Sequence, residues 1–253
     1  MDVGDLVTRN SYGNDIVFRI LKIENNKVIL EGLNYRLICD GDIKDLVLAT
    51  QDQIKYEDKI NENYEVRTTG KNTEIKYVSG KILHIDGDKR LLNKCLNLYK
   101  RFGVYAVGVY LDEKEIENNV ISLIKEHQPD ILIITGHDSY NKKGLSSLDN
   151  YLNSKYFVAS IKKVRKEYSK QELIIISGAC QSHFEALLAS GADFAMSPKR
   201  VNIHTYDPAI IAIIASMTPF NEIIMFNKVL RYTYMKKDGV GGLETYGKLR
   251  LLL

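Results

Sequence analysis

The feature that most constrains the fold is an alternation of short apolar runs with helical patterns, which begins at residue 81. The apolar runs are KILHI, VYAVGVY, DILIIT, ELIIIS and DFAMS, at 81–85, 104–110, 130–135, 172–177 and 193–197. Segments with helical spacing separate and follow them, at 88–102, 113–127, 156–170, 182–190 and 207–217. Strands that are apolar along nearly their whole length are typical of a parallel sheet covered by helices on both faces. We therefore predict that residues 80–253 form an α/β domain around a parallel sheet.

The first 49 residues follow a different pattern. Short runs of Val, Ile, Leu and Phe are broken by turn residues at 12–15, 25–26 and 31–32. This spacing is typical of a small meander that closes into an SH3-like β-barrel, and we predict such a domain at 1–49. Residues 50–79 are polar and hold few large apolar side chains. We predict a linker with marginal helix there.

Composition limits the classes of protein that the chain can belong to. Of its 253 residues, 45% are hydrophobic and 26% charged, which is ordinary for a soluble globular protein. A net charge of +3 is too small to indicate nucleic-acid binding. There is no apolar run long enough for a membrane span, and the start, MDVGDLVTRN, lacks the hydrophobic region of a signal peptide. The three scattered cysteines suit free thiols in a reducing compartment. We expect a cytoplasmic protein with no nucleic-acid and no membrane partner.

Cys180 stands at a corner where a predicted strand meets a predicted helix. Ligands of parallel sheets bind at the carboxyl ends of the strands, and Cys180 comes just after the fourth strand. Ser182 and Glu185 form the S-x-x-E pattern of a capping box, which predicts a helix N-terminus that lowers the pKa of the thiol. The alternative is that Cys180 is a small buried apolar residue, as most free cysteines are.

His137 favours a catalytic role for this thiol. It follows the third strand, one strand–helix–strand unit before Cys180, so we expect the two side chains to meet at one edge of the sheet. A histidine beside a thiol can act as general acid or base in acyl transfer, although a lone histidine there can also be a capping residue. The backbone N–H groups of Asp138 and Cys180 can form an oxyanion hole. A zinc site from Cys180, His183 and His204 is a further alternative, but the spacing matches no metal motif. We expect no metal and no cofactor.

Three stretches of the chain resemble one known family. ITGHDSYNKKG, IIISGACQSHFEALLASGADFAMSPKRVNIH and GVGGLETYGKLRL resemble the YabG sporulation-specific proteases of spore-forming Firmicutes, and the resemblance covers nearly the whole chain. It implies a cysteine peptidase that cleaves after arginine and processes spore coat and cortex-associated proteins late in sporulation. Such a protein would lie in the cytoplasm of the sporulating cell and associate with the spore coat. The order of histidine and cysteine is also similar to that of the caspase-like (clan CD) peptidases, which implies a caspase-like, flavodoxin-like parallel-sheet domain.

The resemblance also implies roles for individual residues. His137 is the general acid/base and Cys180 the nucleophile, with no third member of a triad evident. Asp138 stands where the caspase-like group usually has glycine, which puts the oxyanion donor at that position in doubt. Selectivity for arginine requires a carboxylate, because a desolvated guanidinium must be paired. Asp86 and Asp88 follow the first strand, where arginine-specific relatives often have that acid, and helix capping is the alternative role for both.

Two further expectations concern the chain as a whole. Arg67, in the polar segment NENYEVRTTG, is a candidate site of self-cleavage, with a plain solvated charge as the alternative. The α/β part is alternatively a receiver-like or flavodoxin-like regulatory module, or a scaffold that binds coat proteins without catalysis. A receiver carries its phosphate-accepting aspartate at the end of the third strand, where this chain has Gly136 and His137.

Overall fold

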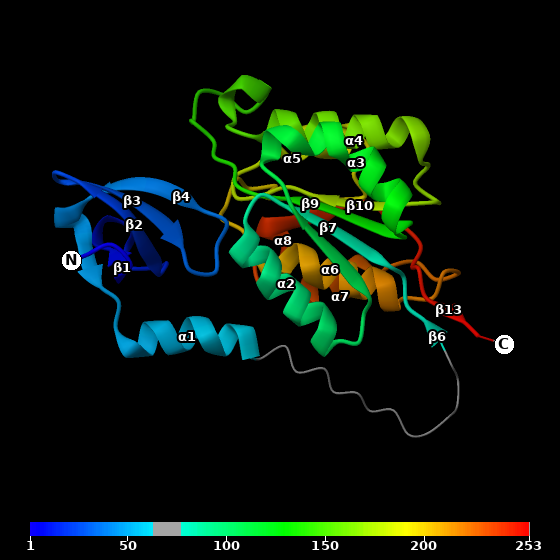
Figure 1. Cartoon of the computed structure of the whole chain (residues 1–253), viewed down its shortest axis with the longest axis horizontal. Helices are drawn as coiled ribbons and strands as arrows, with labels where there is room; N and C mark the ends of the chain where they lie inside the picture. Colours follow the sequence, from blue (N-terminus) through cyan, green and yellow to red (C-terminus); the bar gives the residue numbers. More distant parts are fainter. Residues whose placement is uncertain (63–76, 253) are drawn as a thin grey trace. The chain divides into compact units, whose positions relative to one another are not determined.

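The computed structural model describes residues 1–62 and 77–252, and the chain divides into two compact units, Met1–Lys71 and Asn72–Leu253. The first unit is built on an antiparallel sheet whose strand order is β4-β3-β2-β1-β5 (Figure 1). Buried residues alternate with more exposed ones along β3, as expected of a sheet with one face in a core. The elements of this unit are β1 (Leu6–Arg9), η1 (Asn10–Tyr12), β2 (Phe18–Glu24), β3 (Lys27–Gly32), β4 (Ile38–Asp42), η2 (Ile43–Asp45), β5 (Leu46–Leu48) and α1 (Gln51–Glu62).

The second unit contains a six-stranded sheet in the order β12-β11-β10-β9-β7-β8. Its strands run parallel except for β12, which pairs antiparallel with β11. These strands are β7 (Ile82–Asp86), β8 (Ala106–Tyr110), β9 (Ile131–Thr135), β10 (Ile174–Ser177), β11 (Phe194–Met196) and β12 (Val240–Gly242). A separate two-stranded sheet is formed by β6 (Tyr77–Val78) and β13 (Arg250–Leu251). The prediction of a mostly parallel sheet is confirmed.

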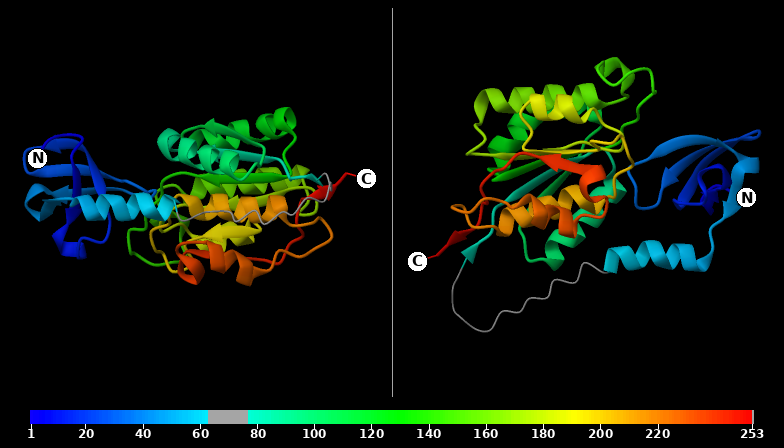
Figure 2. Two further views of the ribbon diagram at one scale, coloured as in Figure 1. Left: turned by 90° about the horizontal axis from the view of Figure 1, so that it is seen from below. Right: turned by 180° about the vertical axis from the view of Figure 1, so that it is seen from behind.

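Helices cover both faces of the six-stranded sheet. In Figures 1 and 2, α3, α4 and α5 lie on one face and α2, α6, α7 and α8 on the other. Their bounds, with one short 3-10 helix, are α2 (Lys89–Arg101), α3 (Glu113–His127), η3 (Leu148–Asn150), α4 (Ser154–Glu167), α5 (Phe184–Ala189), α6 (Tyr206–Met217), α7 (Phe226–Tyr232) and α8 (Lys236–Gly239). The arrangement follows from β7, β9 and β10, every residue of which is buried, because a strand that is apolar on both faces needs a helix layer over each.

The core between the sheet and the α3–α5 layer is continuous. Leu83, Leu132 and Ile175 of the sheet belong to one cluster with Ile116 of α3 and Phe157 of α4. On the opposite face α6 is buried along almost its whole length, which explains why its sequence is apolar on all sides. Burial of this kind fixes β9 and β10 side by side and thereby sets where the residues after them emerge.

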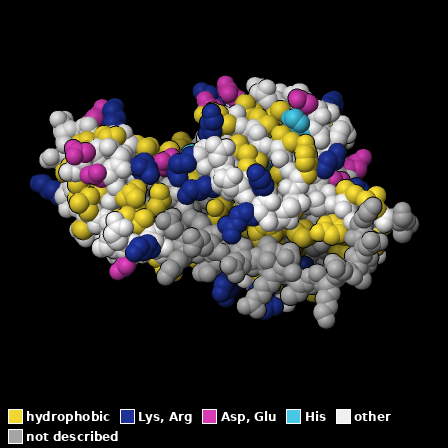
Figure 3. All heavy atoms as spheres, turned by 60° about the horizontal axis from the view of Figure 1, so that its bottom comes forward, with side chains coloured by type: hydrophobic (Ala, Val, Ile, Leu, Met, Phe, Trp, Pro, Cys, Tyr) yellow, Lys and Arg dark blue, Asp and Glu magenta, His cyan; other side chains and the backbone are white. Residues whose placement is uncertain are grey.

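The surface of the chain mixes polar and apolar side chains. On the face drawn in Figure 3, lysine and arginine side chains are interspersed with hydrophobic ones. Exposed apolar side chains are normal in folded proteins and do not mark a binding face by themselves. In the part of the chain that the structure describes, no helix is long and apolar enough to cross a membrane.

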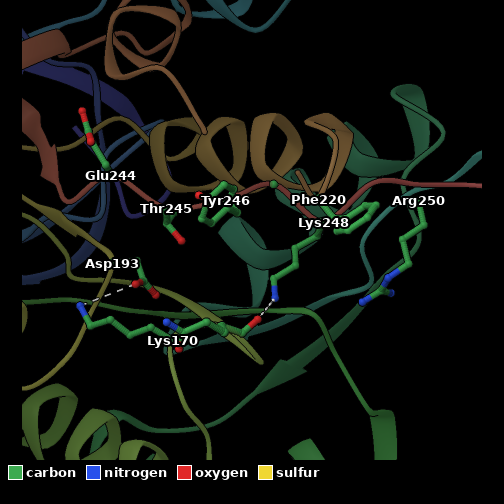
Figure 4. A pocket seen from close by; sticks show the side chains of 10 residues that line it. Lys170, Asp193, Phe220, Glu244, Thr245, Tyr246, Lys248 and Arg250 are labelled. Atoms are coloured by element: carbon green, nitrogen blue, oxygen red, sulfur yellow. Dashed lines mark hydrogen bonds and ion pairs between the residues drawn. The ribbon is translucent and has the colours of Figure 1, made fainter. Parts of the chain in front are cut away.

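A cavity of about 370 Å³ lies at the edge of the sheet where the parallel strands begin (Figure 4). Lys170 and Gln171, which precede β10, and Asp193, which precedes β11, help to line it. Lys248 lies against this edge, and its Nζ donates hydrogen bonds to the carbonyl oxygens of Gln171 and Glu172. The residues singled out from the sequence follow the strands instead, so the cavity belongs to the other edge of the sheet.

Candidate functional site

The structure brings His137 and Cys180 to the same edge of the sheet. His137 follows β9 and Cys180 follows β10, and these strands are parallel neighbours. Ile134 lies opposite Ser177 in the register, so His137 and Cys180 each come three residues after paired positions. The hydrogen bond from Gly178 N to Ile134 O continues this pairing past the end of β10. The parallel register therefore places both residues where parallel sheets bind their ligands.

Cys180 is buried in a sharply turned segment. Gly178 has a φ of 120° and Gln181 a φ of 57°, so the backbone takes left-handed conformations on either side of the thiol. The backbone N–H of Ile203 donates to Sγ of Cys180 at 3.2 Å. The thiol in turn lies 3.8 Å from the carbonyl oxygen of Ile203, to which it donates. The thiol is thus held against the segment that joins β11 to α6.

The expected capping box ahead of α5 is wrong. The helix begins at Phe184 with His183 as its N-cap, and Nδ1 of His183 accepts a hydrogen bond from the backbone N–H of Ala186. Ser182 is already engaged, because its Oγ accepts from the backbone N–H of Ala179. The helix therefore starts later than the pattern indicated and is only six residues long, so its dipole contributes little at the thiol.

His137 lies between two carboxylates. Its Nε2 is 3.4 Å from Oδ2 of Asp88, and its Nδ1 is 3.5 Å from Oε1 of Glu113. Burial alone would lower the pKa of His137, but the two carboxylates outweigh it and raise the pKa to about 9. The same contact with His137 lowers the pKa of Asp88 against the opposing effect of burial. At neutral pH the ring is therefore an imidazolium.

Glu113 is a site residue that the sequence analysis missed. It lies at the start of α3, far along the chain from His137, where an acid is ordinarily explained by the helix dipole. A signal was nevertheless present in the sequence. Gly87 and Gly136 follow two strands that are neighbours in the sheet, and both leave space that the carboxylate of Glu113 fills.

Asp86 is the last residue of β7, and Asp88 lies two residues further along the chain. Asp88 is the N-cap of α2, and its Oδ1 accepts from the backbone N–H of Leu91. Asp86 is completely buried, and its carboxylate accepts from the backbone N–H of Asp88 and from Oγ1 of Thr135. Nε2 of His84 lies 2.8 Å from the same Thr135 oxygen, so a buried polar network underlies this edge. Both acids thus lie at the strand end where the sequence placed them.

Asp138 is anchored by its side chain, and its backbone N–H remains available. The carboxylate accepts from the backbone N–H groups of Ser139 and Asn153 and from Oγ of Ser154. Burial raises the pKa of Asp138 in spite of these donors. Within residues 1–62 and 77–252, no acceptor takes the backbone N–H of Asp138. This backbone N–H is one of the two donors that we predicted from the sequence for an oxyanion hole.

The remaining candidates are spread more widely. Nε2 of His183 lies 3.2 Å from the carbonyl oxygen of Ser146. Among the described residues, no group of three His, Cys, Asp or Glu side chains is arranged to hold a metal ion. Arg67 lies outside the described residues.

Comparison with known proteins matches the whole chain to one family. The family model described as YabG peptidase U57 matches residues 2–253. The sporulation-specific protease YabG of Bacillus subtilis (strain 168) is 42% identical over 279 residues, an alignment that covers 98% of this chain and 96% of the relative. The resemblance seen in the three sequence stretches is therefore confirmed, and the chain belongs to the YabG family of peptidases.

Proposed function

We propose that the chain is a cysteine endopeptidase of sporulation with Cys180 as nucleophile and His137 as general acid/base. The observation that carries the proposal is the register of β9 and β10, which brings these two residues to one edge of the sheet. Its support from the comparisons is the peptidase family and the relative named as a sporulation-specific protease. The order of the two residues on neighbouring strands also favours the caspase-like arrangement for the α/β unit. The small antiparallel sheet is proposed to be an SH3-like barrel.

The proposed reaction is an acyl transfer through a thioester. The thiolate of Cys180 attacks the carbonyl carbon of the scissile peptide bond, and the resulting oxyanion accepts hydrogen bonds from the backbone N–H groups of Asp138 and Cys180. His137 gives a proton to the leaving amine as the C–N bond breaks. Water then attacks the thioester and gives a proton to His137. The C–S bond breaks, which releases the carboxylic acid product and restores the thiolate of Cys180 beside a protonated His137. The raised pKa of His137 supports this role, because the ring enters the cycle with the proton that the amine needs.

Specificity for arginine is proposed to come from Asp86 and Asp88. Asp86 is the last residue of β7 and Asp88 follows it, and β7 pairs with β9, so both acids and His137 share one end of the sheet. A guanidinium that leaves water needs such a partner.

We propose spore coat and cortex-associated proteins as substrates, with the enzyme in the cytoplasm of the sporulating cell and then on the spore coat. Residues 50–79 are proposed as the linker between 1–49 and 80–253, with Arg67 as a self-cleavage site.

The experiment that tests the proposal compares wild type with Cys180→Ala on an arginine-containing protein. Mass spectrometry of the new termini should show cleavage after arginine by wild type and none by the variant. His137→Ala should lower turnover by roughly two to four orders of magnitude, the usual scale for a positioned acid/base group. Cys39→Ala and Cys95→Ala are the controls, since each removes a thiol outside the proposed site and should leave cleavage intact.

Each result has a definite meaning. Wild-type turnover by folded Cys180→Ala would refute the nucleophile. A receiver-like module or an inert coat-protein scaffold would leave every substrate intact, and its Cys180 thiol would alkylate no faster than a free thiol. A thiol that alkylates rapidly at neutral pH in wild type and slowly in His137→Ala would support the peptidase.

A further inference from the structure

Glu113 contacts His137 at two atoms. Its Oε1 accepts a hydrogen bond from the backbone N–H of His137 at 2.7 Å and lies 3.5 Å from Nδ1 of the same residue. The two side chains are only 15% and 17% exposed, so the contact is largely shielded from water. Glu113 is the first residue of α3, where the helix dipole stabilises a negative charge. One carboxylate thus fixes both the backbone and the ring of His137.

Two glycines provide the space for this carboxylate. Gly87 follows β7 and Gly136 follows β9, and a Cβ atom at either position would overlap Oε1 of Glu113. Neither glycine has a positive φ, so the backbone conformation does not require glycine there. The side chain of Glu113 therefore explains both glycines. The strand ends are shaped to admit a carboxylate beside His137.

Other charged and titratable groups lie near the imidazole. Asp88 faces Nε2 from the start of α2, and Arg90 lies 4.0 Å from the same Asp88 oxygen. Tyr110 and Asp112 precede α3 and are hydrogen bonded to each other at 3.2 Å. Asp88 can also serve an incoming guanidinium. Glu113 lies between the two glycines and stays beside the imidazole of His137.

We infer that Glu113 is a positioning residue of the reaction. The carboxylate of Glu113 holds Nδ1 of His137 and leaves Nε2 as the nitrogen that exchanges protons. The inference rests on the proposed function and supplies the third group that the sequence did not reveal. It explains why His137 keeps its proton at neutral pH although it is mostly buried, since a negative charge within about 4–6 Å favours the imidazolium.

The test compares two ways of removing the carboxylate from the ring. Glu113→Gln keeps the shape of the side chain and removes its charge. Gly136→Ala leaves Glu113 in the sequence but displaces its carboxylate, which is the flexible end of a side chain. Glu115→Gln is the matched control, because Glu115 is an exposed acid in the same first turn of α3.

Two measurements are made on each variant. The pKa of His137 is followed by NMR of its imidazole, whose signal is assigned by its loss in His137→Ala. The pH profile of kcat/KM is measured on an arginine-containing peptide. We expect the pKa of His137 to fall by about one to three units in Glu113→Gln and in Gly136→Ala. The alkaline limb of the kcat/KM profile should move to lower pH in the same two variants. Neither the pKa nor the alkaline limb should change in Glu115→Gln.

The outcomes separate this inference from the proposed function. An unchanged pKa of His137 in both Glu113→Gln and Gly136→Ala overturns the inference, and so does a lowered pKa that leaves the alkaline limb in place. The proposed function fails differently, through wild-type turnover in His137→Ala or Cys180→Ala, whatever the NMR titration shows.

Discussion

Asp88 has two roles in the proposed mechanism, as a neighbour of His137 and as a partner of a substrate guanidinium. Its Oδ2 faces Nε2 of His137 in the free chain, and the same carboxylate is a proposed partner of a substrate guanidinium. A guanidinium that pairs with Asp88 would draw it away from His137 and leave Nε2 free to serve the scissile bond. Asp86 has no such contact with His137, because its carboxylate lies within the network of Thr135 and the backbone N–H of Asp88. The two acids should therefore differ when each is neutralised.

We predict that Asp86→Asn and Asp88→Asn both weaken cleavage after arginine, but through different kinetic constants. Losing the partner of a desolvated guanidinium typically costs about 2–5 kcal/mol, so KM for arginine substrates should rise in either variant. Asp88→Asn should in addition lower the alkaline limit of activity, because His137 loses one of its two carboxylates. The measurement is kcat and KM against pH on arginine and lysine peptides.

Asp112→Asn is the control for these variants, since Asp112 is an exposed acid before α3 that contacts Tyr110 and Lys114. Unchanged selectivity in both Asp86→Asn and Asp88→Asn would assign arginine recognition to another carboxylate.

At the scale of residues, sequence patterns predict the positions that follow strands better than the partners that meet there. His137, Cys180 and Asp88 follow strands and Asp86 ends one, so a reliable strand assignment is enough to place them. Glu113 depends on how α3 lies over the ends of β7 and β9, which is decided by packing among distant residues. The partner of His137 could not be derived from spacing alone.

At the scale of elements, the strands and helices of the α/β unit were largely predictable. The predicted helix at 113–127 coincides with α3, and the predicted strands at 81–85 and 130–135 agree with β7 and β9 to within a residue at each end. These elements are buried on the faces that their apolar pattern indicates, so local pattern and tertiary packing agree. The predicted start of α5 was wrong because Ser182 Oγ accepts a hydrogen bond from the backbone N–H of Ala179, three residues earlier, and is therefore engaged in the turn before the helix.

Ser154 joins three elements of the site, and we predict that Ser154→Ala is destabilising. Its Oγ donates to Asp138 after β9 and accepts from the backbone N–H of His183 before α5, while Ser154 itself starts α4. The change leaves a buried carboxylate and a buried N–H without this partner, a loss of about 1–3 kcal/mol for each unsatisfied group. Urea unfolding followed by far-UV circular dichroism should show a lower midpoint.

The control for this change is Ser122→Ala, on an exposed face of α3, where the hydroxyl bonds only to its own helix. A midpoint for Ser154→Ala equal to that of Ser122→Ala would mean that water replaces the lost hydroxyl. The hydroxyl of Ser154 would then add no stability to the joined elements.

At the scale of the whole molecule, the chain consists of two compact units with a polar stretch of sequence between their sheets. The first unit has its own antiparallel sheet and the second its own parallel sheet, so each has secondary structure that does not depend on strands of the other. The change of hydrophobic pattern after residue 49 predicts two parts of the chain, whereas the two compact units divide after Lys71.

The last prediction is that the enzyme cleaves its own chain after Arg67. This arginine lies outside the described residues, so the prediction rests on its polar surroundings, NENYEVRTTG, which hold few apolar side chains that a core would need. Wild-type protein stored at neutral pH should acquire a new N-terminus at Thr68, detected by mass spectrometry of the intact fragments. Cys180→Ala should stay whole, and so should Arg67→Gln, whereas Arg231→Gln, which changes an exposed arginine on α7, should be cut like wild type. An enzyme that cleaves another protein yet remains intact after long storage would contradict the prediction. Cleavage at Arg67 that persists in Cys180→Ala would also contradict it, because a contaminating protease would then be responsible.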